Sequence, residues 1–67
     1  MRANIEKIYW LRVQQGLSIA ELCKKSNVSK PTILRLFKGK TATRPDTIGK
    51  IAKALGITNV KELFLND

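Results

Sequence analysis

The chain of 67 residues is long enough for one small domain, which would bury only about 60% of the surface of its unfolded chain. It contains no histidine and a single cysteine, so it can build neither an internal disulfide framework nor a thiolate and imidazole metal site, and a Ser-His-Asp or Cys-His catalytic pair is absent. The net charge is +8, which indicates a polyanionic partner, and no apolar run approaches the ~20 residues needed to cross a bilayer. We expect a cytoplasmic protein that is not an enzyme, has no cofactor, metal or small-molecule ligand, and does not bind membranes.

The first two predicted helices cover residues 3–15 and 18–26. Apolar residues recur at helical spacing in the first, and Gly16 is a natural C-cap because glycine adopts a positive φ without steric cost. Ser18 and Glu21 stand at the spacing of a capping box, in which each side chain accepts a hydrogen bond from the other residue's backbone.

The third predicted helix covers residues 30–38. Asn27 ends the preceding helix, since asparagine tolerates a left-handed turn. Ser29 is the predicted N-cap, Pro31 falls in the first turn, where its missing N–H does no harm, and Gly39 ends the helix.

Two more helices complete the chain. The fourth begins near Pro45 and ends at Gly56, and the fifth covers about residues 59–65, with Asn59 and Glu62 at capping-box spacing. No segment has the pattern of a strand. Short helices joined by short turns predict an all-α fold: one compact domain over residues 1–67, built as an orthogonal bundle of five helices.

The second and third helices have the pattern of a helix-turn-helix over about residues 18–38. Such a unit needs a small residue at the crossing, a turn residue that tolerates a positive φ, and apolar residues after the turn and on the inner side of the second helix. Those residues are Cys23, Asn27, Val28, Ile33 and Leu36.

The opposite side of the third helix carries its polar and charged residues. Ile33, Leu36 and Phe37 fall within about a third of the helical circle, which leaves the other side exposed. The outward residues are Lys30, Pro31, Leu34, Arg35 and Lys38, flanked by Thr32. The major groove of DNA accepts one α-helix, and arginine can bind guanine through two acceptors there while a threonine methyl can meet a thymine methyl.

The charge distribution agrees with a DNA partner. Nine lysines and arginines and one acidic residue, Asp46, lie between residues 24 and 53, whereas the charges of the rest of the chain cancel. Cations concentrated in this way release the counterions condensed on phosphates. The alternative, a solvated basic surface, stays open at this point.

The motifs also resemble a known family. The sequences GLSIAEL at 16–22, VSKPTI at 28–33, GK at 39–40, RP at 44–45 and KIAKALGI at 50–57 resemble the phage repressor and Cro-like (Xre-type) helix-turn-helix family, over about residues 4–65. The resemblance implies a lambda repressor-like domain that regulates transcription. It also implies double-stranded DNA as the partner, with a palindromic operator bound by a homodimer.

The resemblance assigns roles by position. Base reading is expected from Lys30, Pro31, Thr32 and Arg35. Contacts with the DNA backbone are expected from Ser18, Ser29, Lys38, Lys40, Thr41 and Arg44. One departure concerns Phe37, which replaces the glutamate that pairs in many members with the arginine matching Arg12; we expect Arg12 to stack on the Phe37 ring instead.

Two further readings of the sequence stay open. Val60, Phe64 and Leu65 offer more apolar surface than one side of the last helix can bury, and are candidates for a dimer interface. Trp10 is predicted to be exposed. The same bundle could therefore be a protein-interaction module, antitoxin-like or adaptor, that uses the Trp10 or Phe64 surface. A membrane-active basic peptide is disfavoured, because glycine and asparagine breaks prevent one long amphipathic helix.

Overall fold

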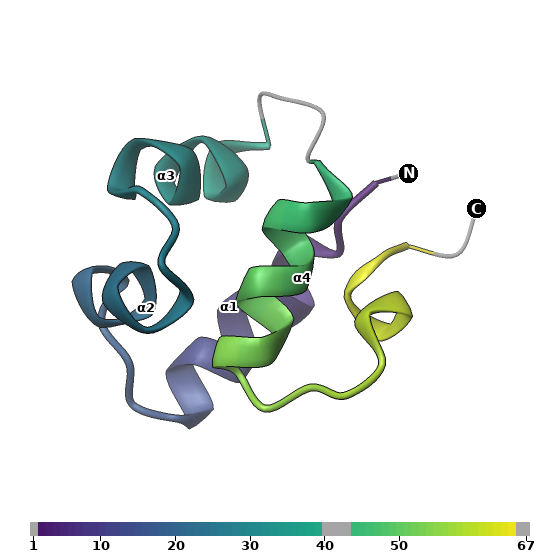
Figure 1. Cartoon of the computed structure of the whole chain (residues 1–67), viewed down its shortest axis with the longest axis horizontal. Coiled ribbons are helices and arrows are strands. Elements are labelled where there is room, and N and C mark those ends of the chain that lie inside the picture. Colours follow the sequence, from purple (N-terminus) through teal and green to yellow (C-terminus); the bar gives the residue numbers. More distant parts are fainter. Residues whose placement is uncertain (1, 40–43, 66–67) are drawn as a thin grey trace.

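Four α-helices and one short 3-10 helix follow one another in the part of the chain that the computed structural model describes, residues 2–39 and 44–65. They are α1 (Ile5–Gln14), α2 (Ile19–Ser26), α3 (Lys30–Lys38), α4 (Pro45–Ala54) and the 3-10 helix η1 (Val60–Leu63). Figure 1 shows α2 and α3 next to each other on the left and η1 on the right of α4. The all-α class is confirmed, and so are the bounds of the third helix.

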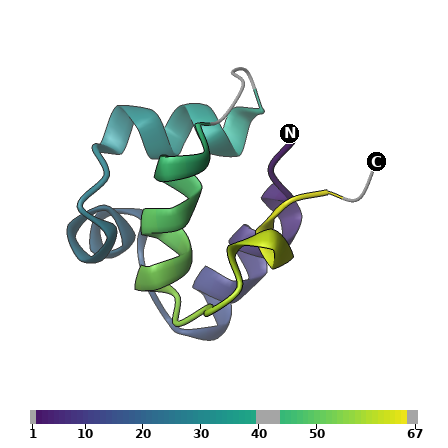
Figure 2. The same cartoon turned by 45° about the vertical axis from the view of Figure 1, so that its right-hand side comes forward.

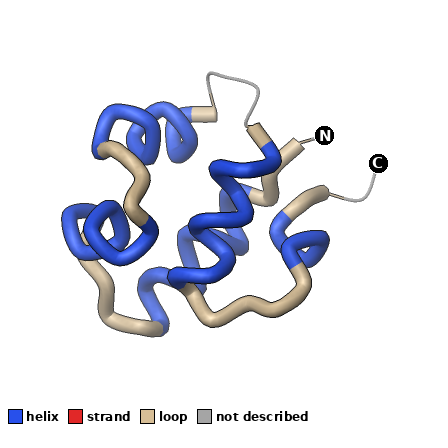
Figure 3. Tube along the Cα trace, in the orientation of Figure 1, coloured by secondary structure: helices blue, strands red, loops and turns tan. Residues whose placement is uncertain are grey.

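The helices run in several directions around one apolar interior. In Figure 2, α3 runs across the direction of α4, and Figure 3 shows in tan the loops that connect α1 to α2, α2 to α3 and α4 to η1. Helix α4 packs on α2 and η1, whereas α1 packs on α3 and η1. Every described element contributes to the interior, whose largest fully buried side chains are Ile8, Leu22, Ile33, Ile48, Ile51 and Leu63.

The turn between α1 and α2 and the start of α2 match the sequence prediction. Gly16 has a φ of +66°, and Ser18 and Glu21 form both bonds of a capping box: Glu21 N–H donates to Ser18 Oγ at 3.1 Å, and Ser18 N–H donates to Glu21 Oε1 at 2.9 Å. Asn27 has a φ of +59° and ends α2 in the left-handed conformation, as predicted.

Arg12 joins α1 to both helices of the helix-turn-helix. Its Nη1 donates a hydrogen bond of 2.6 Å to the carbonyl oxygen of Leu17, the residue before the N-cap of α2. Its guanidinium carbon lies 5.8 Å from the centre of the Phe37 ring and 5.2 Å from that of Tyr9. The predicted stacking on Phe37 is confirmed, and Tyr9 provides a second aromatic face, which was not predicted.

The predicted fifth helix, near residues 59–65, is shorter than expected and is not an α-helix. The helical part is a single 3-10 turn, after which Phe64 is extended and forms an antiparallel bridge with Ala3. Two backbone hydrogen bonds flank the bridge, from Asn4 N–H to Leu63 O at 2.7 Å and from Leu65 N–H to Arg2 O at 2.8 Å. Because these bonds satisfy the backbone at both ends of the described chain, residues after Leu63 do not continue the helix.

The same bridge shortens the first helix, which begins at Ile5 rather than at residue 3. Asn4 is its N-cap and accepts a hydrogen bond from the backbone N–H of Lys7 at 3.2 Å. The predicted capping pair in the last helix forms only in part, since the Asn59 side chain accepts from Lys61 N–H while the Glu62 carboxylate lies 3.9 Å from Lys7 Nζ.

Candidate nucleic-acid interface

The outer face of α3, made of Lys30, Pro31, Leu34, Arg35 and Lys38, is exposed in the structure. The inner side of the helix buries Ile33 and Leu36, with Phe37 half-buried beside them. Thr32 is half-buried at the border between the two sides. The predicted division of α3 into a buried and an exposed side is thus confirmed, and three of the four residues predicted to read bases (Lys30, Pro31 and Arg35) are exposed.

The N-terminus of α3 differs from its sequence prediction. Ser29 is the N-cap by its extended backbone, but its side chain makes no capping hydrogen bond. Instead, its hydroxyl oxygen lies 2.8 Å from the hydroxyl oxygen of Thr32. The backbone N–H groups of Lys30 and Thr32 therefore have no side-chain acceptor at this helix end, and Pro31 has no N–H that would need one. An unoccupied helix N-terminus favours an anion through these donors and the helix dipole.

The N-terminus of α2 is occupied by its own acidic residue. The Glu21 carboxylate accepts the Ser18 N–H, and hydrogen bonding by the backbone and the side chain of Ser18 lowers the pKa of Glu21. A phosphate that approaches here meets an ionised carboxylate. Ser18 is exposed, so it remains reachable, but the helix end offers less to an anion than that of α3.

The segment between α3 and α4 carries three of the predicted backbone contacts. Lys40 and Thr41 lie outside the described residues. Arg44 is exposed at the N-cap of α4, and its Nε is 3.5 Å from Oδ1 of Asp46. Side-chain exposures of 81% and 63% make this a weak pair, because water screens it. Arg44 can therefore exchange Asp46 for a phosphate at little cost.

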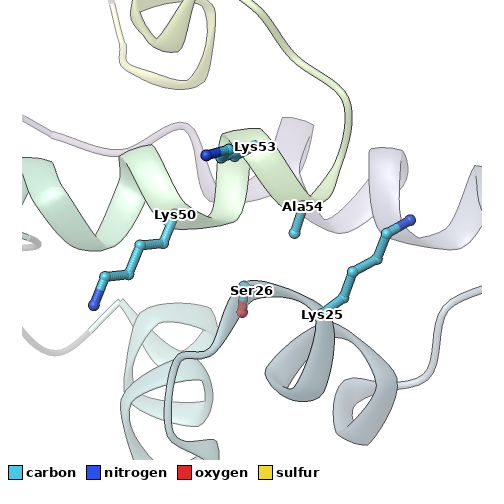
Figure 4. A pocket seen from close by; sticks show the side chains of 5 residues that line it. All are labelled: Lys25, Ser26, Lys50, Lys53 and Ala54. Atoms are coloured by element: carbon cyan, nitrogen blue, oxygen red, sulfur yellow. The ribbon is translucent and has the colours of Figure 1, made fainter.

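A shallow hollow of about 280 Å³ lies between α2 and α4 and is lined by lysines. Its residues are Lys25, Ser26, Lys50, Lys53 and Ala54. Figure 4 shows that the side chains of Lys25 and Lys50 extend away from each other, so their ammonium groups do not converge on a common ligand. The Ser26 hydroxyl is buried and donates to the Leu22 carbonyl oxygen at 2.6 Å. We assign this hollow no ligand.

Apolar side chains are exposed at three places. The first place is a group of three residues on α1, Tyr9, Trp10 and Val13. Trp10 is 54% exposed, which confirms its predicted exposure. Of the dimer candidates, Leu65 is exposed whereas Val60 and Phe64 are half-buried, and dimerisation through them remains a prediction. The third is Leu34, which is 39% exposed. The helical wheel of α3 already places Leu34 on the outward side among cations, but the sequence alone assigns it no role.

The described residues contain neither a metal-site constellation nor a membrane span. Within 2–39 and 44–65, no three side chains of histidine, cysteine, aspartate or glutamate come together as possible metal ligands. In the same ranges, no helix combines the length and the apolar character that crossing a membrane requires.

Comparison with known proteins identifies the fold family. The HTH_3 helix-turn-helix family model matches residues 8–63, from α1 to the end of η1. The crystal structure of an HTH_3 family transcriptional regulator from Vibrio cholerae is similar to 96% of this chain, with a TM-score of 0.80 and 26% sequence identity, and this chain covers 35% of that regulator. No curated protein was found to match the sequence. The chain belongs to the HTH_3 helix-turn-helix family.

Proposed function

We propose that this chain is a DNA-binding transcriptional regulator, acting as a repressor, that inserts α3 into the major groove of an operator half-site. The observation that carries the proposal is the outer face of α3. It is exposed, it holds three cations and no acidic residue, and it begins at a helix end without a side-chain cap. Membership of the HTH_3 family and the similar transcriptional regulator support the same function.

Base reading is assigned to Lys30, Pro31, Thr32 and Arg35. The guanidinium of Arg35 can donate two parallel hydrogen bonds to guanine O6 and N7, the pairing that best distinguishes guanine in the major groove. Lys30 stands in the first turn of α3 and can reach a base edge past the helix end. The structure supports this assignment by exposing both side chains.

Phosphate binding is assigned to the residues around the ends of the helices. The strongest support is for the backbone N–H groups at the start of α3, because these donors have no side-chain acceptor. Ser29 stands beside them as the exposed N-cap, with its hydroxyl paired to Thr32. Arg44 and Lys38 are exposed cations, and Lys40 and Thr41 are assigned by the family resemblance. The assignment of Ser18 has the least support, because its backbone N–H already donates a hydrogen bond to the Glu21 carboxylate. Contacts of this kind fix the register of the protein without reading sequence.

A homodimer is proposed to bind a two-fold-symmetric operator. Its interface would use the apolar end of the bundle, with Leu65 at the surface and Val60 and Phe64 beside it. Two copies of α3 would then enter successive major grooves about one turn of DNA apart, ~34–36 Å. Analytical ultracentrifugation with and without the operator tests this; a 1:1 complex on a two-fold site would contradict it.

The test of the function is selection of bound duplexes from a random library, followed by a salt titration of the best duplex. We expect a recurrent sequence with two half-sites and an affinity that falls steeply as salt rises. Duplexes that are not retained even at low ionic strength would refute the proposal.

Two substitutions separate the assigned roles. Arg35→Ala should weaken binding to the selected duplex by ~1–3 kcal/mol and relax the preference at one base pair, whereas Lys38→Ala should weaken all duplexes alike and lower the salt slope by about one. Lys61→Ala is a matched control, because Lys61 is exposed on η1, away from the helix-turn-helix. A uniform loss from Arg35→Ala would show that Arg35 only binds phosphate.

A second candidate function is a protein-interaction module, and the exposed group Tyr9, Trp10 and Val13 favours it. Aromatic side chains are enriched in the centres of protein interfaces, and Trp10 is the most exposed of the large apolar residues described. This function predicts that Trp10→Ala abolishes the biological effect while Arg35→Ala leaves it intact. The DNA-binding function predicts the opposite pair of results.

A further inference from the structure

Leu34 is an apolar side chain in the middle of a cationic surface. Lys30, Leu34 and Lys38 follow one another at intervals of four residues, so they lie along one line of the helix. All three are exposed, and Leu34 is 39% exposed. Pro31, three residues before Leu34, adds a second exposed apolar side chain to the same side of α3. No residue of α3 is acidic.

Leu34 does not belong to the interior of the bundle. The buried residues of α3, Ile33 and Leu36, point to the other side, and Leu34 is not among the partly buried side chains packed against the core. Single exposed leucines are common and are usually neutral. This one, however, lies between two cations of a surface for which a polyanion has been proposed, so docking of α3 would remove it from water.

The chemistry of the major groove limits what Leu34 can meet there. Most atoms at the base edges are hydrogen-bond donors or acceptors, and covering one with a leucine leaves it without a partner, which is unfavourable. The exception is the C5-methyl group of thymine, which is apolar and projects into the groove. A leucine therefore discriminates in two ways: it gains contact with a methyl group and it disfavours polar edges at the same position.

We propose that Leu34 is a specificity-determining residue that recognises the C5-methyl group of a pyrimidine, supplied by a thymine in each half-site. Lys30, assigned to a base edge, and Lys38, assigned to a phosphate, lie one turn before and one turn after Leu34, so their contacts hold the helix against the DNA on both sides of it. The inference rests on the proposed function, because it assigns a base preference to the same outer face of α3.

The test uses the duplex selected from the random library, resynthesised with deoxyuridine in place of one thymine at a time. Deoxyuridine lacks only the methyl group, so pairing is unchanged. At one thymine of each half-site we expect the dissociation constant, measured by fluorescence anisotropy, to rise about fourfold, from the ~0.8 kcal/mol that burial of one such group contributes. The Leu34→Ala variant should bind the thymine and deoxyuridine duplexes equally.

A matched control and a second methyl source sharpen the test. Val13→Ala also shortens an exposed apolar side chain, on α1, and should keep the fourfold response. Cytosine or 5-methylcytosine is also placed at the position where deoxyuridine weakens binding, to test whether the methyl group itself is recognised. We expect the wild type to bind the methylated base more tightly by a similar factor.

Several results would overturn the inference. A wild-type protein that binds the duplex but responds to no deoxyuridine, or that binds cytosine and 5-methylcytosine alike, does not recognise a methyl group. A response that persists in Leu34→Ala assigns the contact to another side chain. In these cases the proposed function stands, whereas failure to bind any duplex would refute the function and the inference together.

Discussion

The two helices of the helix-turn-helix both follow a serine N-cap, but the two serine side chains form different hydrogen bonds. Ser18 starts α2 and Ser29 starts α3, both with extended backbones. The Ser18 hydroxyl accepts a backbone N–H of its helix, whereas the Ser29 hydroxyl pairs with the Thr32 side chain. Only at α2 are the N-terminal donors served by the protein's own side chains.

The residue three positions after each serine explains the difference. At α2 it is Glu21, whose carboxylate reaches back to the backbone of Ser18 and completes the capping box. At α3 it is Thr32, which is too short to reach the N-cap backbone in this way and offers a hydroxyl instead. One helix start thus has a complete capping box, whereas the other leaves the N–H groups of Lys30 and Thr32 without a side-chain acceptor.

The largest expected effect concerns Arg12, whose side chain binds the backbone just before α2. Arg12→Leu removes a charge-assisted hydrogen bond to Leu17 and two cation-π contacts, with Tyr9 and Phe37, so we expect the free energy of unfolding to fall by roughly 2 kcal/mol. Urea denaturation measures it. Arg2→Leu removes a cation whose side chain is exposed and should change little. An unchanged urea midpoint for Arg12→Leu would mean that the contacts of Arg12 do not stabilise the protein.

The next effect comes from giving α3 the cap of α2. Thr32→Glu places a carboxylate three residues after Ser29, which should raise the free energy of unfolding by about 0.5–1 kcal/mol. The same carboxylate would occupy the helix end and repel phosphate, so affinity for duplex DNA should fall at least about tenfold, ~1.4 kcal/mol. Thr32→Gln, which caps without charge, should lose less affinity. Equal losses for the two variants would speak against an anion at this helix end.

A smaller effect distinguishes the two serines directly. Ser18→Ala should lower the free energy of unfolding by about 1 kcal/mol, because it leaves the Glu21 N–H without its acceptor. Ser29→Ala removes no capping bond and should cost only about a few tenths of a kcal/mol. Thermal or urea denaturation of both variants gives the comparison. Similar losses would show that the two helix starts are energetically alike.

The smallest effect is a dependence on pH. Because the pKa of Glu21 is lower in the folded protein than in the unfolded chain, its contribution to stability is complete above the unfolded pKa. It is lost as pH falls through the folded pKa. Glu21→Gln lacks this contribution, so we expect the stability difference between wild type and variant to shrink on acidification. A difference that grows in acid would contradict the lowered pKa.

Much of the fold follows from local residue chemistry. Gly16 and Asn27 mark turns that need a positive φ, and both have one in the structure. The apolar spacing in α3 identified which of its sides is buried. The stacking of Arg12 was predictable as well, because Phe37 removes the acidic partner that many family members have and offers an aromatic ring in its place.

Features that depend on distant or competing partners were not predictable. Serine at an N-cap usually bonds the backbone, and only the geometry shows that the Ser29 hydroxyl has Thr32 as a competing partner. The last segment has a helical pattern, but bonds with residues about sixty positions earlier override it. The place of Leu34 was visible on the helical wheel, whereas its role depends on the ligand proposed for that surface.

The bridge between Ala3 and Phe64 has a consequence for the native-state fluctuations of the molecule. The amides of Asn4 and Leu65 donate across it, from opposite ends of the described chain. We expect the bridge to open as a whole, which would break both bonds and release both segments together. Hydrogen–deuterium exchange should therefore find these two amides equally protected, as members of one cooperative unit. Different protection of the two would place them in separate units.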